Sequence, residues 1–171
     1  MNNCFIILAG GESKRFNSKV PKPYTLYKGK PLILHSIEKA KNYMKFNKII
    51  VVINKKHKKF IKKLNIRNIK IIEGGKTRAD SSYRALKSIK SYNIKNVMIH
   101  DAARPNFSIR LLENLTKKLR LYKCVIPAIK TMDSIKEKSL NSFKNLNRKN
   151  FYFTQTPQAF DYKELFKLQK N

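Results

Sequence analysis

The residues best suited to chemistry gather near the start of the chain, where an apolar run ends in two glycines and several cations. Residues 4–8 form the run, Gly10 and Gly11 follow it, and the next basic residues are Lys14, Arg15, Lys19 and Lys22. Glycine lets the backbone approach an anion closely, and clustered cations attract phosphate. The stretch is therefore typical of a loop that handles the phosphates of a nucleotide.

The spacing of this loop separates it from two better-known phosphate loops. The sequence contains neither G-x-x-x-x-G-K-[ST] nor G-x-G-x-x-G, which disfavours a kinase-like P-loop and a dinucleotide fold. A glycine turn with solvated lysines explains the same residues equally well. The interpretation therefore depends on the rest of the chain.

Runs rich in Ile and Val alternate along the chain with segments of helical periodicity. The apolar runs are 4–8, 48–53, 69–72, 96–99 and 124–129, and the helical segments are 31–43, 56–64, 77–91, 109–121 and 162–169. Strands that alternate with helices predict right-handed βαβ units. We expect an α/β fold of one domain, residues 1–171, with a Rossmann-like, mostly parallel sheet and helices on both faces.

Polar residues follow four of the five apolar runs. In an open α/β sheet, ligands bind beyond the carboxyl ends of the strands. Turns are rich in Gly and Asp for reasons of backbone geometry alone, but four coincident strand ends favour one shared site. The residues are Gly10, Gly11 and Arg15; Gly74, Gly75 and Arg78; His100, Asp101 and Arg104; and Asp133 and Ser134.

Among these residues, Asp101 is the best-placed carboxylate for a divalent metal, because it follows the 96–99 run closely. With one carboxylate, Mg²⁺ would be held mainly by phosphates and water; a helix cap or turn is the alternative role. We interpret His100 as structural, since in-line displacement by a phosphate oxygen needs no proton removed. Arg104 and Arg148 are candidate clamps for a substrate phosphate, although a surface salt bridge explains either one.

The charge of the chain points to a different class of function. Its 171 residues include 39 Lys and Arg against 10 Asp and Glu, a net charge of +29, which suits a polyanionic partner such as nucleic acid. The lysines are spread along the whole chain, and Lys, Asn and Ile share adenine- and thymine-rich codons. The densest cluster, residues 55–63, has Phe60 and Ile61 at helical spacing, so we expect a solvated helix face there.

The cysteines and the apolar segments indicate a cytoplasmic protein. Cys4 and Cys124 each lie in a strand-like run without a metal-ligand pattern, so we expect two buried free thiols. No apolar stretch approaches the ~18 residues that cross a bilayer, and the first residues lack the pattern of a signal peptide. The hydrophobic content of 42% supplies a core.

A set of short motifs extends along nearly the whole chain. The most specific are His100-Asp101-Ala102-Ala103-Arg104-Pro105 and Gln155-Thr156-Pro157-Gln158. The others are Ala9-Gly10-Gly11, Arg15-Phe16, Pro21-Lys22-Pro23-Tyr24, Gly29-Lys30-Pro31, His35-Ser36, Gly74-Gly75 with Arg78 and Ser81, Asp133-Ser134-Ile135-Lys136 and Asn147-Arg148. In this order and spacing the motifs resemble those of one enzyme family, the 2-C-methyl-D-erythritol 4-phosphate cytidylyltransferases of the non-mevalonate isoprenoid pathway.

The resemblance implies a reaction and a role for each matching residue. CTP and methylerythritol phosphate would give 4-diphosphocytidyl-2-C-methyl-D-erythritol and pyrophosphate, with Mg²⁺. Arg15 and Lys22 would stabilise the transition state. Arg148 would act across a homodimer interface, formed by a small arm around residues 133–152. The nucleotide would bind Ala9, Gly10, Gly11, Gly75, Ser81, Asp101 and Ala102, with the metal at Asp101; the second substrate would bind Arg104, Asp133, Ser134 and Thr156.

The sequence departs from the family pattern in a few places. Ser13 replaces a usual glycine, Lys76 a common acidic residue, and Ser134 and Asn147 the usual Thr and Asp. The family continues beyond the Gln155 motif with a segment that contains Asn-Ile-Lys. We therefore expect a C-terminally truncated domain, either a fragment or the leading part of an enzyme fused to a cyclodiphosphate synthase. It should bind CTP with Mg²⁺ but turn over slowly or not at all.

Two rival functions remain open. A ribitol 5-phosphate cytidylyltransferase would share the loop and the fold, and the pair Ala102-Ala103 favours methylerythritol phosphate over it. A basic nucleic-acid-binding domain would explain the charge, but the sequence shows no aromatic RNA-binding motif and no helix-turn-helix signal.

Overall fold

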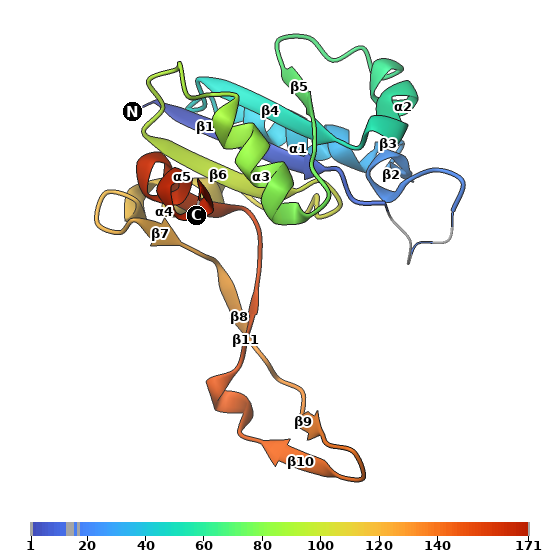
Figure 1. Ribbon diagram of the computed structural model, residues 1–171, viewed down its shortest axis with the longest axis vertical. Helices are drawn as coiled ribbons and strands as arrows, with labels where there is room; N and C mark the ends of the chain where they lie inside the picture. The colour runs from blue at the N-terminus through green and yellow to red at the C-terminus, as the bar shows by residue number, and fades with distance from the viewer. Residues whose placement is uncertain (1, 13–15, 17, 171) are drawn as a thin grey trace.

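The computed structural model describes residues 2–12, 16 and 18–170 and centres on a six-stranded sheet (Figure 1). The strand order is β5-β4-β1-β6-β12-β7. Neighbours among β5, β4, β1 and β6 run parallel, whereas β12 is antiparallel to β6 and β7. The strands are β1 (Asn3–Ala9), β4 (Lys48–Ile53), β5 (Lys70–Glu73), β6 (Asn96–Asp101), β7 (Cys124–Val125) and β12 (Gln158–Asp161).

Helices cover both faces of this sheet, as the sequence predicts. Side chains alternate along β1: Phe5 and Ile7 pack in one core with α1 and α4, whereas Cys4 and Ile6 pack in a second core with α3 and α5. All four side chains are fully buried, which is why a strand covered on both faces reads as a continuous apolar run. The helices are α1 (Leu32–Asn42), α2 (Lys58–Lys62), α3 (Arg78–Lys87), α4 (Ile109–Lys118) and α5 (Tyr162–Lys170).

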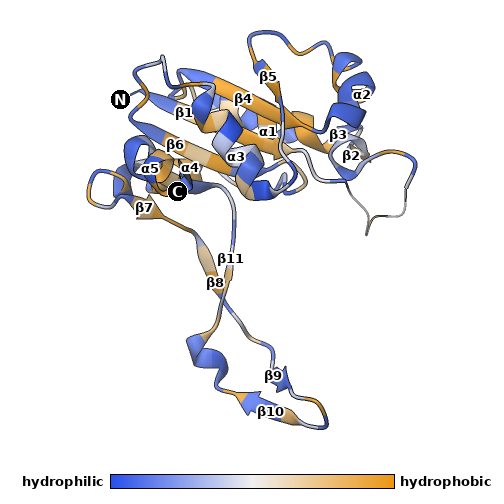
Figure 2. Ribbon diagram, in the orientation of Figure 1, coloured by the Kyte–Doolittle hydropathy of each residue, from blue (hydrophilic) through white to orange (hydrophobic). Residues whose placement is uncertain are grey.

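Among the described residues, four short elements lie in the connections between strands and helices: three between β1 and α1, and one between β4 and α2. They are η2 (Lys22–Tyr24), β2 (Leu26–Tyr27), β3 (Lys30–Pro31) and η3 (Lys55–His57). The lysines of the 55–63 cluster are exposed, while His57 and Ile61 are buried. The expected solvated helix face is confirmed, and Figure 2 shows α2 as largely hydrophilic beside the hydrophobic centre of the sheet.

An arm extends away from the sheet and is built from segments that the sequence analysis read partly as a core strand (Figure 1). The expected strand 124–129 is two strands, β7 and β8 (Ala128–Lys130), with Pro127 between them. β8 leaves the sheet and pairs with β11 (Tyr152–Thr154). Beyond that pair lie β9 (Ile135–Lys138) and β10 (Phe143–Leu146), which pair with each other, and η4 (Arg148–Asn150).

The sheet also contains β12, to which the sequence analysis assigned no strand. β12 lies between β6 and β7, and its Ala159 is fully buried. A four-residue strand with polar residues at both ends carries too little periodicity to be recognised.

The two cysteines differ, which corrects the expectation that both are buried. Both are free, but Cys4 is buried in β1 whereas Cys124 is exposed. Burial raises the pKa of Cys4 to about 12. Cys124 lies on β7, a two-residue strand at the edge of the sheet beside β12, where less of the fold covers its side chain than in the central strand β1. Within the described part of the chain, no helix is long and apolar enough to cross a membrane.

Candidate active site

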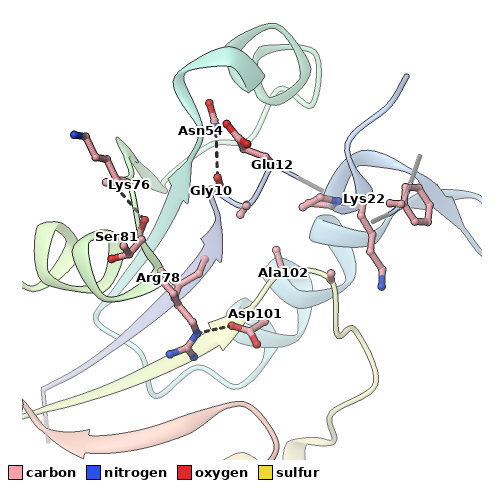
Figure 3. Close-up of a pocket in the computed structure, with 17 residues that line it drawn as sticks. Gly10, Glu12, Lys22, Asn54, Lys76, Arg78, Ser81, Asp101 and Ala102 are labelled. Carbon is pink, nitrogen blue, oxygen red and sulfur yellow. Dashed lines mark hydrogen bonds and ion pairs between the residues drawn. The ribbon is translucent and has the colours of Figure 1, made fainter. Parts of the chain in front are cut away.

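A cavity of about 980 Å³ opens at the carboxyl ends of β1, β4 and β6, beside the start of α3 (Figure 3). The register explains its position, because Ala9 lies opposite Ile53 of β4 and Leu8 lies opposite Asp101 of β6. The three strands therefore end at one level, as the strand-end argument expects. The cavity is lined by residues 8–12, 16, 22–23, 54, 75–78, 81 and 101–103.

The backbone of the first loop forms one wall of the cavity. Among the residues that the structure describes, no atom lies within 4 Å of a Cβ built on Gly11, so the backbone is open on this side to a ligand. The carbonyl of Gly10 accepts a hydrogen bond from Asn54 Nδ2 at 3.2 Å, and Asn54 Oδ1 accepts one from the Lys56 amide at 2.9 Å. Asn54 directly follows β4, whose end the sequence analysis left out of its comparison. The same rule would have identified it.

The start of α3 forms the opposite wall. Ser81 Oγ accepts a hydrogen bond from the Gly75 amide at 3.1 Å. A Cβ on Gly75 would lie 2.2 Å from Asp80 Cβ, so this glycine is required by packing. Thr77 caps the helix and exchanges hydrogen bonds of 3.0 Å with Asp80. The capping box fixes the first turn of α3 against the cavity.

Asp101 lies at the end of β6 between two arginines. Its Oδ1 is 3.2 Å from Arg78 Nε, and its Oδ2 is 3.4 Å from Arg104 Nε. Each arginine also contacts a glutamine: Arg78 Nη2 lies 3.5 Å from Gln158 Oε1, and Arg104 Nη1 lies 3.2 Å from Gln155 Oε1. Asp101 does not cap a helix, because α4 uses Ser108 as its N-cap. The carboxylate therefore lies at the cavity wall with both oxygens engaged.

His100, the neighbour of Asp101, is fully buried below the cavity. Its Nε2 lies 3.2 Å from Ser36 Oγ, and its Nδ1 lies 2.9 Å from Thr156 Oγ1. Burial lowers the pKa of His100 to about 3, and the nearby Arg104 and Lys39 charges act in the same direction. The ring is neutral near pH 7 and links β6 to α1 through Ser36 and to the segment between β11 and β12 through Thr156, which confirms its structural role.

Lys22 reaches the cavity from η2, which is held by aromatic packing. The Tyr24 ring stacks on Phe60 of α2 with 5.3 Å between centroids, and its edge meets His57 at 5.7 Å. Lys22 Nζ lies 6.0 Å from the centroid of Phe16. The buried face of the lysine-rich segment 55–63 thus positions a cation at the cavity.

Comparison with known proteins identifies the family. Residues 3–171 match the profile of IspD, 2-C-methyl-D-erythritol 4-phosphate cytidylyltransferase. The chain belongs to this family. It is 70% identical to the bifunctional enzyme IspD/IspF of Pelagibacter ubique over 171 residues, which is 100% of this chain and 46% of that enzyme. It is 38% identical over 160 residues to a 2-C-methyl-D-erythritol 4-phosphate cytidylyltransferase of Azobacteroides pseudotrichonymphae, covering 91% of this chain and 71% of that protein.

Solved structures of IspD proteins share the fold. The bifunctional IspDF of Campylobacter jejuni superposes with a TM-score of 0.85 at 33% identity, over 100% of this chain and 44% of that one. The IspD of Francisella tularensis gives 0.81 at 30% identity, over 99% and 77%. The chain thus spans less than half the length of the bifunctional relatives. Members of the IspD family are nucleotidyltransferases, so the resemblance seen in the sequence is confirmed.

Most of the residues expected to bind a nucleotide in an IspD enzyme come together in the cavity. They are Ala9, Gly10, Gly11, Lys22, Gly75, Ser81, Asp101 and Ala102. Arg15 lies outside the described residues. The sequence analysis missed Glu12 and Asn54 as lining residues; Glu12 Oε1 lies 3.8 Å from Lys56 Nζ.

The residues expected to bind the second IspD substrate do not line this cavity. Thr156 is buried, and its hydroxyl contacts His100 and, at 3.4 Å, accepts from the Asp101 amide. Asp133 and Ser134 precede β9 in the arm, and Arg148 Nη1 donates to the Met132 carbonyl at 2.7 Å, also in the arm. The expectation that the fifth strand end joins the shared site is therefore wrong within one chain, because that strand turns into the arm.

Proposed function

We propose that the protein transfers the cytidylyl group of CTP to 2-C-methyl-D-erythritol 4-phosphate, in the synthesis of isoprenoid precursors. A phosphate oxygen of methylerythritol phosphate would attack the α-phosphorus of CTP, and the bond from that phosphorus to the bridging oxygen would break, releasing pyrophosphate. The observation that carries this proposal is the cavity in which the open backbone at Gly11, the cation Lys22 and the carboxylate of Asp101 meet. Family membership supports the same reaction.

The cavity suits a nucleoside triphosphate in size and polarity. Its volume of about 980 Å³ lies near the upper end of the usual range for small-ligand sites. In our proposal the base lies beside Gly75 and Ser81, the ribose beside Asp101 and Ala102, and the triphosphate beside Gly11 and Lys22. A cation beside the α-phosphate stabilises the negative charge that develops on its oxygens in the transition state, when the attacking oxygen replaces the leaving oxygen on the α-phosphorus. We assign the same role to Arg15.

The donor set of the cavity fits a magnesium ion brought in by the nucleotide. Among the described residues no group of three or more His, Cys, Asp or Glu side chains could hold a metal by itself. Asp101 offers hard carboxylate oxygens, and Mg²⁺ commonly takes one or two carboxylates together with substrate phosphates and water. When bound, Mg²⁺ would neutralise charge on the phosphates. Asp101 would orient the nucleotide relative to Lys22.

The arm supports a homodimer in which each chain completes the site of the other. Several large apolar side chains of the arm are exposed, among them Leu140 at 99%, Met132 at 78% and Phe143 at 66%. Exposed apolar patches of this kind mark interaction surfaces. We propose that two arms pair and bring Asp133, Ser134 and Arg148 to the partner's cavity, where they hold methylerythritol phosphate with Arg104.

The proposed compartment is the cytoplasm, because both cysteines are free and one of them is exposed. Reducing conditions in the cytosol keep such thiols unpaired.

The proposal is tested by substrate-dependent release of pyrophosphate from the purified protein and by calorimetric titration with CTP. We expect CTP to bind in the presence of Mg²⁺, with methylerythritol phosphate preferred over ribitol 5-phosphate. Lys22→Met removes the cation at the cavity, and Lys87→Met at the far end of α3 is the matched control. Loss of binding in both variants, or a preference for ribitol 5-phosphate, would contradict the assignment.

A further inference from the structure

The carboxylate of Asp101 is engaged by two guanidinium groups that differ in position. Arg78 is the first residue of α3 and lines the cavity. Arg104 lies three residues after Asp101, beyond the end of β6, and is not among the described residues that line the cavity. Figure 3 shows the Arg78 side chain reaching across the cavity wall to Asp101. A ligand that enters the cavity therefore meets the Arg78–Asp101 pair.

This pair conflicts with a metal at the same carboxylate. Mg²⁺ requires its oxygen ligands at about 2.0–2.1 Å, in near-octahedral geometry. A guanidinium bonded to the same oxygen repels the metal and occupies one of its lone pairs. Arg78 Nε donates a hydrogen bond to Oδ1, whereas Arg104 lies at an ion-pair distance of 3.4 Å from Oδ2, so a cation that approaches Oδ1 from the cavity competes with Arg78.

Arg78 is the partner that a ligand in the cavity can displace, because it lines the cavity whereas Arg104 does not. Its contact with Gln158 is long, at 3.5 Å, whereas Arg104 has a 3.2 Å contact with Gln155. The two arginine side chains are equally exposed, at 51% and 50%, so water can solvate Arg78 once it is released. An ion pair with this exposure is weak and can be exchanged at little cost.

We propose that Arg78 is an exchangeable counter-ion of Asp101, which competes with Mg²⁺ for the carboxylate and so raises the Mg²⁺ concentration needed for nucleotide binding. This inference rests on the proposed function. Arg78 is here a positioning residue, which keeps the Asp101 carboxylate oriented at the end of β6 until the metal and its nucleotide replace it.

The test measures CTP binding by calorimetry over a series of Mg²⁺ concentrations. In Arg78→Gln, we expect half-maximal binding at an Mg²⁺ concentration lower by about two- to fivefold, the scale of one exposed ion pair. Lys87→Gln removes the same charge from an exposed position at the other end of α3 and should leave that concentration unchanged. In an Asp101→Asn background, Arg78→Gln should have no further effect.

Three results would overturn the inference. If Arg78→Gln leaves the Mg²⁺ requirement unchanged or increases it while the wild type binds CTP, Arg78 does not compete with the metal. If Lys87→Gln lowers the Mg²⁺ requirement as much, or if Arg78→Gln still lowers it in the Asp101→Asn background, the shift comes from the loss of a positive charge in general and not from the Arg78–Asp101 pair. A lowered melting temperature with weaker CTP binding at every Mg²⁺ concentration would show a structural role. Absence of CTP binding by the wild type would instead refute the proposed function, and this inference with it.

Discussion

The neutrality of His100 predicts how the stability of the protein depends on pH. The ring is fully buried, and burial lowers its pKa from the ordinary value of 6.5 to about 3. Below pH 6.5 the unfolded chain therefore takes up a proton that the folded protein refuses. Stability due to this group is complete above pH 6.5 and falls as the pH decreases from there toward 3.

The size of the effect follows from the pH interval between the pKa of histidine in the unfolded chain and the pH of the measurement, as long as that pH stays above the lowered pKa of the folded protein. Between pH 6.5 and pH 5.0 the loss is about 1.4 kcal/mol per pH unit, so the free energy of unfolding should decrease by about 2 kcal/mol. Burial also lowers the pKa of His57, which adds a loss of the same sign. Glu73 and Asp80, whose pKa values are lowered by their hydrogen bonds to Lys58 and Thr77, contribute only at more acidic pH.

The assay is urea unfolding at pH 7.5 and pH 5.0 of the wild type and of His100→Asn. Asparagine can bond to Ser36 and Thr156 without titrating, so the variant should lose about 2 kcal/mol of the pH-dependent difference, whatever its stability at pH 7.5. Proton NMR of the His100 ring gives a direct measurement. Equal stability of the wild type at both pH values, or a His100 ring that titrates near pH 6.5, would refute the reasoning.

Three further predictions concern the site walls and the arm. Gly75→Ala places a Cβ 2.2 Å from that of Asp80, so it should lower the free energy of unfolding by about 1–3 kcal/mol and weaken CTP binding, as measured by urea unfolding and calorimetry; unchanged values would show that α3 shifts freely. Thr77→Ala removes the N-cap of α3 and should cost about 1 kcal/mol in the same unfolding assay; a neutral effect would mean that Asp80 alone holds the first turn. Phe143→Lys should shift the sedimentation of a dimer toward monomer without changing CTP affinity; unaltered sedimentation would argue against pairing of the arms.

The sequence predicted the sheet and one end of it well, for a physical reason. Strands buried on both faces require continuous apolar runs, and these mark β1, β4 and β6; β5 lies at the edge of the sheet and is partly exposed, but it too follows an apolar run. Since parallel strands end at one edge, the polar residues after these runs had to meet, and the cavity confirms it for Gly10, Gly75 and Asp101. Asn54 was missed although the same rule applies to it.

Other parts of the fold and the site depend on pairings that periodicity does not encode. β12 is short and polar at its ends. Its place between β6 and β7 depends on which strands pair in the folded protein, and the local pattern of the sequence does not encode that pairing. The departure of β8 into the arm separates Asp133 and Ser134 from the cavity, although they follow an apolar run like the others do. Thr156 lies far from His100 in sequence, and only the return of the chain along β6 brings the two together.

The sequence by itself determined the α/β class and the family, because apolar periodicity and short motifs are local properties of the chain. The tertiary structure alone decided what each polar group contacts. It showed Asp101 between Arg78 and Arg104, the neighbouring His100 buried and neutral, and Lys22 supported by the stacking of Tyr24 on Phe60 of α2. Contact distances and burial arise only when distant segments of the chain pack together. They determine which charged groups of this site pair with one another and keep His100 neutral.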